Sequence, residues 1–402
     1  MGVVGDYFSF QNGYAFKSKD FVKNGKYAII RIKELKDGSV KFFTDTARVN
    51  PEDGFNVNKY IVKKGDVLFA LTGDPVNKPN PLSWVGRISY YNYDTPALLN
   101  QRVCKAIPKN KVSNEFLYYF FRQNEEFYNL ASRATGSASQ ANISTKTIEQ
   151  HIMEIPNEDI RKKIVFILLN IDKKIDVNNR INDNLEQQAH AFFQEIFVDN
   201  ANPEWVSGTI SDLGVVVGGG IPSKSKSEYY TDSGIAWITP KDLSVNKSKF
   251  IVHGENDITG LGLKNSSATI MPKGTVLFSS RAPIGYIAIA ADEVSTNQGF
   301  KSVVPKAEIG TAFVYFFLKH NLPIIESMAS GSTFKEISSS TMKNIPAVIP
   351  DTETLARFRD FCTPLFVQQQ ILEKQNQSLA LLRDNLLPKL MSGEVDVSDI
   401  QS

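Results

Sequence analysis

The stretch Ile155–Phe197 reads IPNEDIRKKIVFILLNIDKKIDVNNRINDNLEQQAHAFFQEIF, and the rest of the chain is organised around it. Its apolar residues recur at steps of three and four: Ile164, Leu168, Ile171, Ile175, Leu185, Ala189, Phe192 and Ile196. This spacing predicts a long helix that buries one stripe of its surface. Asn178 and Asn182 interrupt the stripe in its middle.

The same pattern returns 194 residues later, in Ile349–Met391. Its apolar positions are Phe358, Cys362, Leu365, Leu372, Leu379, Leu386 and Leu390. Asn376 falls where Asn182 does, and Asn157 and Asp351 stand where each helix needs an N-cap. Two copies of one amphipathic helix predict an antiparallel coiled coil.

Asn182 and Asn376 are polar positions within the predicted seam, and we expect them to fix the register and orientation of the two helices. The alternative is that both are solvated positions on a slightly twisted helix. Pro364 and Pro388 each remove an intrahelical hydrogen bond, so we expect kinks in the second helix.

The segments that precede the two helices also repeat. Lys64–Phe69 is answered by Lys273–Phe278, and a buried helix predicted for Phe116–Tyr128 is answered by a run beginning at Phe313. The Asp74–Trp84 loop of the first copy is largely missing from the second. A shared framework with different loops is typical of domains that bind different ligands.

The sequence therefore predicts an α+β protein with an internal pseudo-twofold repeat, in which two tandem α/β domains are separated and joined by two long helices. The predicted parts are a domain at 1–154, a helix at 155–200, a domain at 201–348, and a helix with a tail at 349–402.

Composition fits an ordinary globular chain, with 402 residues of which 42% are hydrophobic and 22% are charged. The two cysteines lie far apart, which argues against a disulfide framework or a cysteine-rich metal site and favours a reducing compartment. Neither a secretory signal pattern nor a long apolar run is present in the sequence. We therefore expect a cytoplasmic protein.

The sequence carries no recognisable catalytic motif. Gly218–Ser225 approaches a phosphate-binding loop, but Ser223 replaces its second glycine and Pro222 removes an amide donor, so we expect a glycine turn there. The four histidines lack metal-type spacing, and no serine has a nucleophile-elbow context. We expect no catalytic residue, no metal and no cofactor in this chain.

Several motifs together carry a family likeness. The copies end in Ser144–Pro156 and Ser338–Pro350, which share a Ser-x-x-Thr motif and a terminal Ile-Pro. With Gly219–Ser223, Asn12–Phe16 and the ending Leu387–Glu394, the chain resembles the specificity subunits of type I restriction-modification systems.

This resemblance implies a non-catalytic subunit with two target recognition domains, each of which reads one half of a split double-stranded DNA target. Because the loops of the two copies differ, the target should be asymmetric. The helices would set the half-site spacing and dock two methyltransferase subunits, with the restriction and translocase subunits joining that core. S-adenosylmethionine and ATP would then belong to the partner subunits.

DNA is read by basic, hydroxyl and amide side chains on loops. In the first copy the candidate residues are Lys17, Ser18, Lys19, Thr72, Asn77, Lys78, Ser139, Gln140 and Asn142. In the second copy they are Ser223, Lys224, Lys226, Ser279, Ser280, Arg281, Ser332, Thr333 and Lys335. Each of these could equally be a solvated loop residue or a turn former. Asn100-Gln101 and Asn297-Gln298 recur in both copies and are expected to hold a shared turn.

Two other classes of function stay open. A coiled-coil scaffold that displays two protein- or glycan-binding domains would explain the repeat equally well. That reading leaves unused the basic surplus of residues 1–64, which hold 12 Lys or Arg and 7 Asp or Glu. A methyltransferase or nuclease is disfavoured by the missing motifs.

Overall fold

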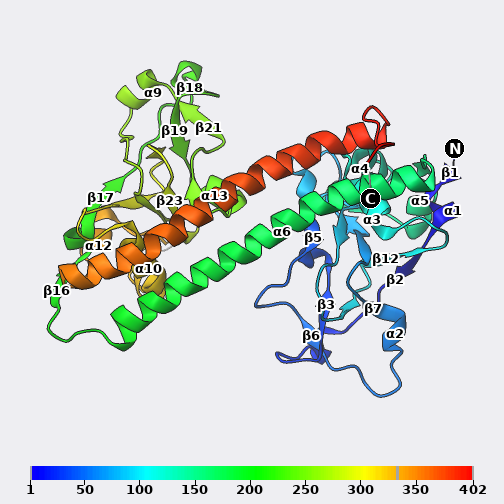
Figure 1. The fold of residues 1–402 in the computed structure, drawn as a ribbon, viewed down its shortest axis with the longest axis horizontal. Helices are drawn as coiled ribbons and strands as arrows, with labels where there is room; N and C mark the ends of the chain where they lie inside the picture. Colours follow the sequence, from blue (N-terminus) through cyan, green and yellow to red (C-terminus); the bar gives the residue numbers. More distant parts are fainter. Residues whose placement is uncertain (1, 332–334, 401–402) are drawn as a thin grey trace. The chain divides into compact units, whose positions relative to one another are not determined.

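The computed structural model describes residues 2–331 and 335–400, and the chain divides into two compact units. Unit 1 contains Met1–Lys174 and Leu379–Ser402, and unit 2 contains Ile175–Ser378. Both boundaries fall inside the long helices α6 (Glu158–Gln194) and α13 (Thr352–Met391) (Figure 1). Each unit therefore combines one α/β domain with a stretch of both helices.

Four sheets form the strand framework of unit 1. The largest has the order β2 (Phe8–Asn12), β12 (Val103–Pro108), β8 (Val67–Ala70), β10 (Ile88–Tyr90), β5 (Gly38–Val40), β4 (Leu35–Lys36). The second has the order β6 (Arg48–Val49), β3 (Tyr27–Ile30), β11 (Ala97–Leu99), β7 (Ile61–Val62). The small ones are β13 (Thr135–Ser137), β14 (Gln140–Asn142), β9 (Thr72–Gly73) and the pair β1 (Gly2–Val3), β15 (Ile152–Met153).

Short helices complete unit 1. They are α1 (Val4–Tyr7), α2 (Val57–Tyr60), α3 (Asn114–Arg122), α4 (Asn124–Ala131), α5 (Thr145–Glu149) and the 3-10 turns η1 (Ser18–Asp20), η2 (Ile32–Glu34), η3 (Pro81–Ser83). The single helix predicted for Phe116–Tyr128 is wrong in one respect, because Gln123 is extended and separates α3 from α4.

Three sheets form the framework of unit 2. The largest has the order β17 (Gly214–Gly218), β25 (Lys301–Pro305), β22 (Val276–Ser280), β23 (Ile284–Ala290), β20 (Phe250–Ile251). The second has the order β18 (Tyr230–Thr231), β21 (Asn256–Ile258), β19 (Ile235–Ile238), β24 (Ser295–Thr296), and the third pairs β16 (Val206–Thr209) with β26 (Pro346–Ile349). Its short helices are α7 (Ile210–Leu213), α8 (Pro240–Val245), α9 (Gly260–Lys264), α10 (Thr311–His320), α11 (Leu322–Ser327), α12 (Ser339–Lys343) and the turn η5 (Ser227–Tyr229).

The internal repeat is confirmed strand by strand. The order β2-β12-β8-β10-β5 in unit 1 matches β17-β25-β22-β23-β20 in unit 2, and in both sheets the last of these strands pairs in parallel with its neighbour. The Ser-x-x-Thr motifs are helix caps. Ser144 Oγ accepts from the N–H of Thr147 at 3.1 Å, and Ser338 Oγ accepts from Thr341 at 3.0 Å.

The predicted helix stripes and caps are confirmed. Every stripe residue is buried or partly buried, and each unit includes part of both stripes in its main hydrophobic cluster. Asn157 and Asp351 cap the two helices, accepting from backbone N–H groups at 2.9 Å and 2.8 Å. Pro364 and Pro388 do not interrupt α13, whereas α6 passes into a π-turn at Glu195–Asp199. In the described part of the chain, no helix combines the length and apolarity needed to cross a membrane.

Candidate nucleic-acid interface

One edge of the unit 1 domain gathers several of the predicted DNA-contacting residues. The N–H of Ile143 donates to the carbonyl of Leu71 at 3.0 Å, which brings the polar stretch 135–142 against the end of β8. Strand β14 pairs with β9, and the Thr72 hydroxyl donates to Asn142 Oδ1 at 2.9 Å. Ser139 and Gln140 are exposed at the tip of the β13–β14 hairpin. Residues about 70 positions apart in sequence thus share one surface.

The loop 74–84 rises from the same edge and is held by its own hydrogen bonds. The N–H of Asp74 donates to Ser83 O at 2.9 Å and closes the base of the loop. The indole N–H of Trp84 donates to Lys78 O at 2.8 Å, and the ring packs against Phe127. Asn77 and Lys78 are exposed on this braced loop. The role of Trp84 was missed, although a tryptophan closing a Pro-Asn-rich loop was a usable signal.

Lys17, Ser18 and Lys19 lie elsewhere in unit 1. All three are exposed at η1, beside the second sheet. The neighbouring ring of Phe16 packs with the rings of Tyr14 and Phe55. This segment therefore lies beside an aromatic cluster that is separate from the β9–β14 edge.

The corresponding edge of unit 2 repeats the backbone geometry with different side chains. The N–H of Ile337 donates to Ser280 O at 3.0 Å, as Ile143 does to Leu71. Glu336 accepts from Arg281 at 3.4 Å and lies 3.6 Å from the amine of Lys301. Lys335 is exposed, and Ser332 and Thr333 lie outside the described residues. The cluster of Arg281, Glu336 and Lys301 was not predicted, because its members are far apart in sequence.

Three candidate hydroxyls are not available at the surface. Ser279 and Ser280 are fully buried, and their hydroxyls donate to Pro283 O at 2.8 Å and Gly299 O at 3.1 Å. Thr72 is only 2% exposed and donates to Asn142. Because these groups are used inside their domains, we do not retain them as base-reading residues. The sequence pattern could not separate a hydroxyl that ends a buried strand from one on a loop.

The prediction of a glycine turn in unit 2 is wrong, because Gly219 and Gly220 lie close against other backbone segments without turning, and the turn comes later, where the N–H of Lys226 donates to Ser223 O at 3.1 Å. A Cβ on Gly219 would lie 2.0 Å from Asn297 O, and a Cβ on Gly13 would lie 2.1 Å from Asn100 O. Asn297 Oδ1 also accepts from the N–H of Gly299 at 2.8 Å. The repeated asparagines therefore hold a shared turn that requires glycine opposite it.

The segment after the glycines of unit 2 carries Ser223, Lys224 and Lys226. All three are exposed on the segment that enters η5. Ser223 Oγ lies 2.9 Å from Ser225 Oγ, and the Lys226 amine lies 3.9 Å from Glu228. The segment offers basic and hydroxyl groups on a surface next to β18 and β19.

The polar seam residues of the helices are only partly as predicted. Within unit 2, Asn376 accepts from Asn178 Nδ2 at 2.8 Å and donates to Asn179 Oδ1 at 2.8 Å. Asn182 instead accepts at its backbone carbonyl from Gln369 at 3.1 Å. Asn376 thus pairs with Asn178 and not with Asn182, because the register places Asn178 opposite it. Asn178 and Asn179 of α6 contact Asn376, whereas Asn182, which comes later in α6, contacts Gln369, which comes earlier in α13. The two helices therefore run antiparallel within this unit.

Metal chemistry finds no support in residues 2–331 and 335–400, where no group of three His, Cys, Asp or Glu side chains is placed to hold an ion. His151 is buried and lies 2.7 Å from Glu126, which is a packing role.

Comparison with known proteins agrees with this arrangement. The family model of the type I restriction modification DNA specificity domain matches residues 2–187 and again residues 202–384. The chain is 37% identical over 191 residues to the type I restriction enzyme MjaIX specificity subunit of Methanocaldococcus jannaschii, a match covering 45% of this chain and 44% of that protein. It is 24% identical over 417 residues to the HindI specificity subunit of Haemophilus influenzae, covering 84% of this chain and 88% of that protein.

A solved structure shares the fold. The type I restriction-modification S subunit from M. genitalium superposes with a TM-score of 0.56 at 18% identity, over 96% of this chain and 94% of that one.

Proposed function

This chain belongs to the type I restriction-modification DNA specificity family, and from this premise we propose that it selects the DNA target of a type I complex without catalysing a reaction itself. Each domain reads one half of a bipartite double-stranded target. The two halves differ, because the polar residues on the two recognition edges differ.

The observation that carries this proposal is the match between the two edges. Ile143 with Leu71 and Ile337 with Ser280 make the same backbone hydrogen bond at 3.0 Å, so the frameworks correspond. The side chains around that bond are unlike each other, with a braced loop at 74–84 in one domain and an ion cluster in which Glu336 pairs with Arg281 and Lys301 in the other. Equivalent scaffolds with different surface donors are suited to reading different base sequences.

The candidates that are exposed or partly exposed fall into two groups according to the chemistry of their side chains. Lysines bind the phosphate backbone and release counterions, so we assign that role to Lys17, Lys19, Lys78, Lys224, Lys226 and Lys335. Base edges are read by amide, hydroxyl and guanidinium groups in well-defined positions. We assign this role to Asn77, Ser139, Gln140 and Arg281. We also assign it to Asn142, although its amide oxygen already accepts from Thr72. Ser18 and Ser223 are assigned to phosphate oxygens.

The long helices form an antiparallel coiled-coil spacer in this proposal and dock two methyltransferase subunits, to which the restriction and translocase subunits attach. Exposed apolar side chains on the helices support a docking role: Phe166 is 44% exposed, Ile371 55% and Leu381 65%. S-adenosylmethionine and ATP are bound by the partner subunits.

The test is co-expression of this chain with its methyltransferase partner, followed by mapping of modified adenines in the host DNA. We expect one split, asymmetric motif. Exchange of residues 1–154 for the same domain of a relative should change one half of the motif and leave the other half and the spacing intact. An absent motif, or one that ignores the exchange, would reject DNA recognition in favour of a protein- or glycan-binding scaffold.

Point variants sharpen this test. Asn77→Ala and Gln140→Ala should relax only the half-site read by the first domain. Asn92→Ala is the matched control, because Asn92 is an exposed amide that follows β10, near the start of β8 and away from the β8 end that borders β9 and β14.

A further inference from the structure

One pair of side chains occupies the same place at the recognition edge of both domains. The matching backbone hydrogen bonds of the two edges, each of 3.0 Å, determine which residues correspond. The residues directly beside those bonds are Thr72 and Asn142 in unit 1 and Arg281 and Glu336 in unit 2. In unit 1 the two residues are also register partners between β9 and β14. Thr72 therefore corresponds to Arg281, and Asn142 corresponds to Glu336.

The hairpins that carry Asn142 and Glu336 agree with this correspondence. Asn142 is the register partner of Thr135 in the β13–β14 hairpin. In unit 2 the N–H of Glu336 donates to Ser330 O at 2.9 Å, and the N–H of Ser330 donates to Glu336 O at 3.1 Å. Both residues thus lie at the base of a hairpin, next to the end of a central strand of the main sheet, which is β8 in one unit and β22 in the other.

The unit 1 pair is neutral and presents an amide. Thr72 is 2% exposed, and its hydroxyl donates to Asn142 Oδ1 at 2.9 Å. This bond fixes the orientation of the partly exposed Asn142 amide, and it leaves the Nδ2 donor and a second lone pair on Oδ1 for a ligand. An amide that offers one donor and one acceptor matches N7 and N6 of adenine in the major groove.

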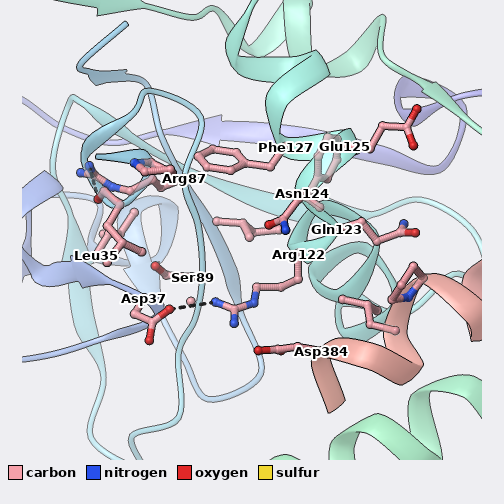
Figure 2. Close-up of a pocket in the computed structure, with 17 residues that line it drawn as sticks. Leu35, Asp37, Arg87, Ser89, Arg122, Gln123, Asn124, Glu125, Phe127 and Asp384 are labelled. Atoms are coloured by element: carbon pink, nitrogen blue, oxygen red, sulfur yellow. Dashed lines mark hydrogen bonds and ion pairs between the residues drawn. The ribbon is translucent and has the colours of Figure 1, made fainter. Parts of the chain in front are cut away.

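A guanidinium beside loop 74–84 is used within the fold of unit 1. Arg87 Nη1 donates to Leu82 O at 2.8 Å and so holds the end of this loop (Figure 2). The Arg87 Nε is buried. Beside Thr72, unit 1 thus presents the amide of Asn142, whereas Arg87 is committed to the loop.

The unit 2 pair is charged and presents a guanidinium. Arg281 Nη1 donates to Glu336 Oε2 at 3.4 Å, and the two side chains are 36% and 38% exposed. Among residues 2–331 and 335–400, the Nε and Nη2 donors of Arg281 have no hydrogen-bond partner. These two donors form one side of the planar guanidinium, and that side matches the O6 and N7 acceptors of guanine.

Lys301 holds the Glu336 carboxylate at its other oxygen. The Lys301 amine lies 3.6 Å from Glu336 Oε1, and its side chain is only 11% exposed. Strand pairing makes Lys301 the counterpart of Cys104, which is fully buried in unit 1. The carboxylate held between two cations is therefore a feature of the second domain, and it limits the rotation of the Arg281 guanidinium.

We propose that this matched pair reads one base in each half of the DNA target. Arg281, positioned by Glu336, donates to O6 and N7 of a guanine in the half-site of the second domain. Asn142, positioned by Thr72, bonds N6 and N7 of an adenine in the half-site of the first domain. This inference rests on the proposed function and adds to it a base identity in each half-site and the two positioning residues.

The test is to express variants of the full chain with the methyltransferase partner and to map modified adenines in the host DNA. The half-site of the second domain should contain an essential guanine. Exchange of the pair, Arg281→Thr with Glu336→Asn, should change that one base to adenine and leave the other positions and the spacing intact. Thermal melting shows whether each variant is folded.

Two single variants test the positioning role of Glu336. Glu336→Ala should lower the preference for guanine at that position about tenfold. Glu336→Gln should restore part of the preference, because its amide oxygen can still accept from the guanidinium. Equal loss of methylation at all sites in Glu336→Ala, without a change in base preference, would overturn the positioning role. If the exchanged pair does not fold, the comparison of these two variants decides the question.

The matched control is Asp176→Asn with Arg180→Thr, because Asp176 and Arg180 form an exposed ion pair at 2.9 Å within α6. Its motif should equal that of the unaltered chain. A split motif that the exchange of Arg281 and Glu336 leaves unchanged would overturn this inference while the proposed function stands. Absence of a split motif for the unaltered chain would reject the proposed function itself.

Discussion

The two units attach their domains to the long helices through different polar contacts. In unit 1, Asp172 of α6 accepts from Arg383 of α13 at 2.7 Å and from the Tyr119 hydroxyl of α3 at 2.7 Å. We call this junction one. Its carboxylate therefore links both helices to the domain through one guanidinium and one phenol.

Junction two, in unit 2, is built around Glu186 of α6. This carboxylate accepts from Lys249 at 2.7 Å, from Lys319 at 2.6 Å and from the Tyr315 hydroxyl at 3.1 Å. The Lys249 amine also lies 3.4 Å from the centroid of the Phe366 ring, which is close enough for a cation–π contact. Burial alone would raise the pKa of Glu186, but the two lysines lower it to about 2.

The comparison teaches which part of the repeat is shared and which part is free to differ. Both junctions use a carboxylate on α6 and a tyrosine on the helix that follows the main sheet. The cations come from different places: Arg383 of α13 serves junction one, whereas junction two uses Lys319 of α10 and Lys249, at the strand position that corresponds to Gly38 of unit 1. We infer that strand order and helix stripes define the scaffold, whereas the junction is tuned separately in each domain.

The largest expected effect comes from removing the buried cation of junction two. Lys249→Met keeps most of the side-chain volume but leaves Glu186 with Lys319 as its remaining cation. Loss of one partner of a buried ion pair typically costs about 3–5 kcal/mol, so we expect unit 2 to lose about that much stability. Hydrogen exchange of the β23 amides in the full chain measures it locally, since a two-unit chain need not unfold in one step.

The exposed Lys264 provides the matched control, and Lys264→Met should change stability by less than about 0.5 kcal/mol. If Lys249→Met also changes the stability by less than about 0.5 kcal/mol, junction two stabilises unit 2 through packing alone.

Acid should weaken junction two, and the direction follows from the pKa of Glu186. The folded state holds that pKa near 2 against an ordinary value of 4.5, so the ionised carboxylate stabilises the fold fully above pH 4.5. This contribution, about 3 kcal/mol, is lost as the pH falls from 4.5 toward 2. The stability difference between the unaltered chain and Glu186→Gln should therefore shrink as the pH falls through that acid range. A difference that does not change with pH would show that the ion pair does not control junction two.

The long helices and the internal repeat could be predicted from the sequence, because their apolar residues and motifs recur at regular spacing. The stripe from Ile155 to Phe197 predicted α6 to within a few residues, and the repeated motifs predicted the second copy. The pairing of polar residues between the two helices could not be predicted in this way, because it depends on contacts between distant segments. Asn178 and Asn182 are four residues apart on one helix face, and only the register of α13 decides which of them meets Asn376.

The candidate DNA contacts were predictable only as regions, for a similar reason. Lys78 and Gln140 are exposed on the predicted loops, but Ser280 ends a buried strand and donates to a backbone carbonyl. Composition marks all three as polar loop-type residues. Their orientation is set by which strand each one borders, and that is tertiary information.

Junction one should respond less than junction two to loss of its anchor. Asp172→Ala removes two hydrogen bonds, one of them to a guanidinium, from a carboxylate that is 25% exposed. Hydrogen bonds to charged groups contribute about 1.5–3 kcal/mol, and we expect unit 1 to lose about 2 kcal/mol. Exchange of the β12 amides reports this loss. Asp176→Ala is the control, because the ion pair that Asp176 forms among the described residues is with the exposed Arg180 on its own helix. A loss in unit 1 larger than that of Lys249→Met in unit 2 would reverse the ranking of the two junctions.

The smallest effect tests the strand equivalence on which the comparison rests. Ser89 and Ala288 occupy matching positions, and the Ser89 hydroxyl is buried without a partner. Ser89→Ala should therefore raise the stability of unit 1 by up to about 1 kcal/mol. The reciprocal change, Ala288→Ser, should lower the stability of unit 2 by about 1–2 kcal/mol, because Ala288 is buried among apolar side chains such as Leu277 and Ile238, which offer the new hydroxyl no acceptor. Thermal melts of the two variants should thus shift in opposite directions. If both shift downward, the Ser89 hydroxyl already has a hydrogen-bond partner in solution, and Ser89 and Ala288 do not lie in equivalent environments.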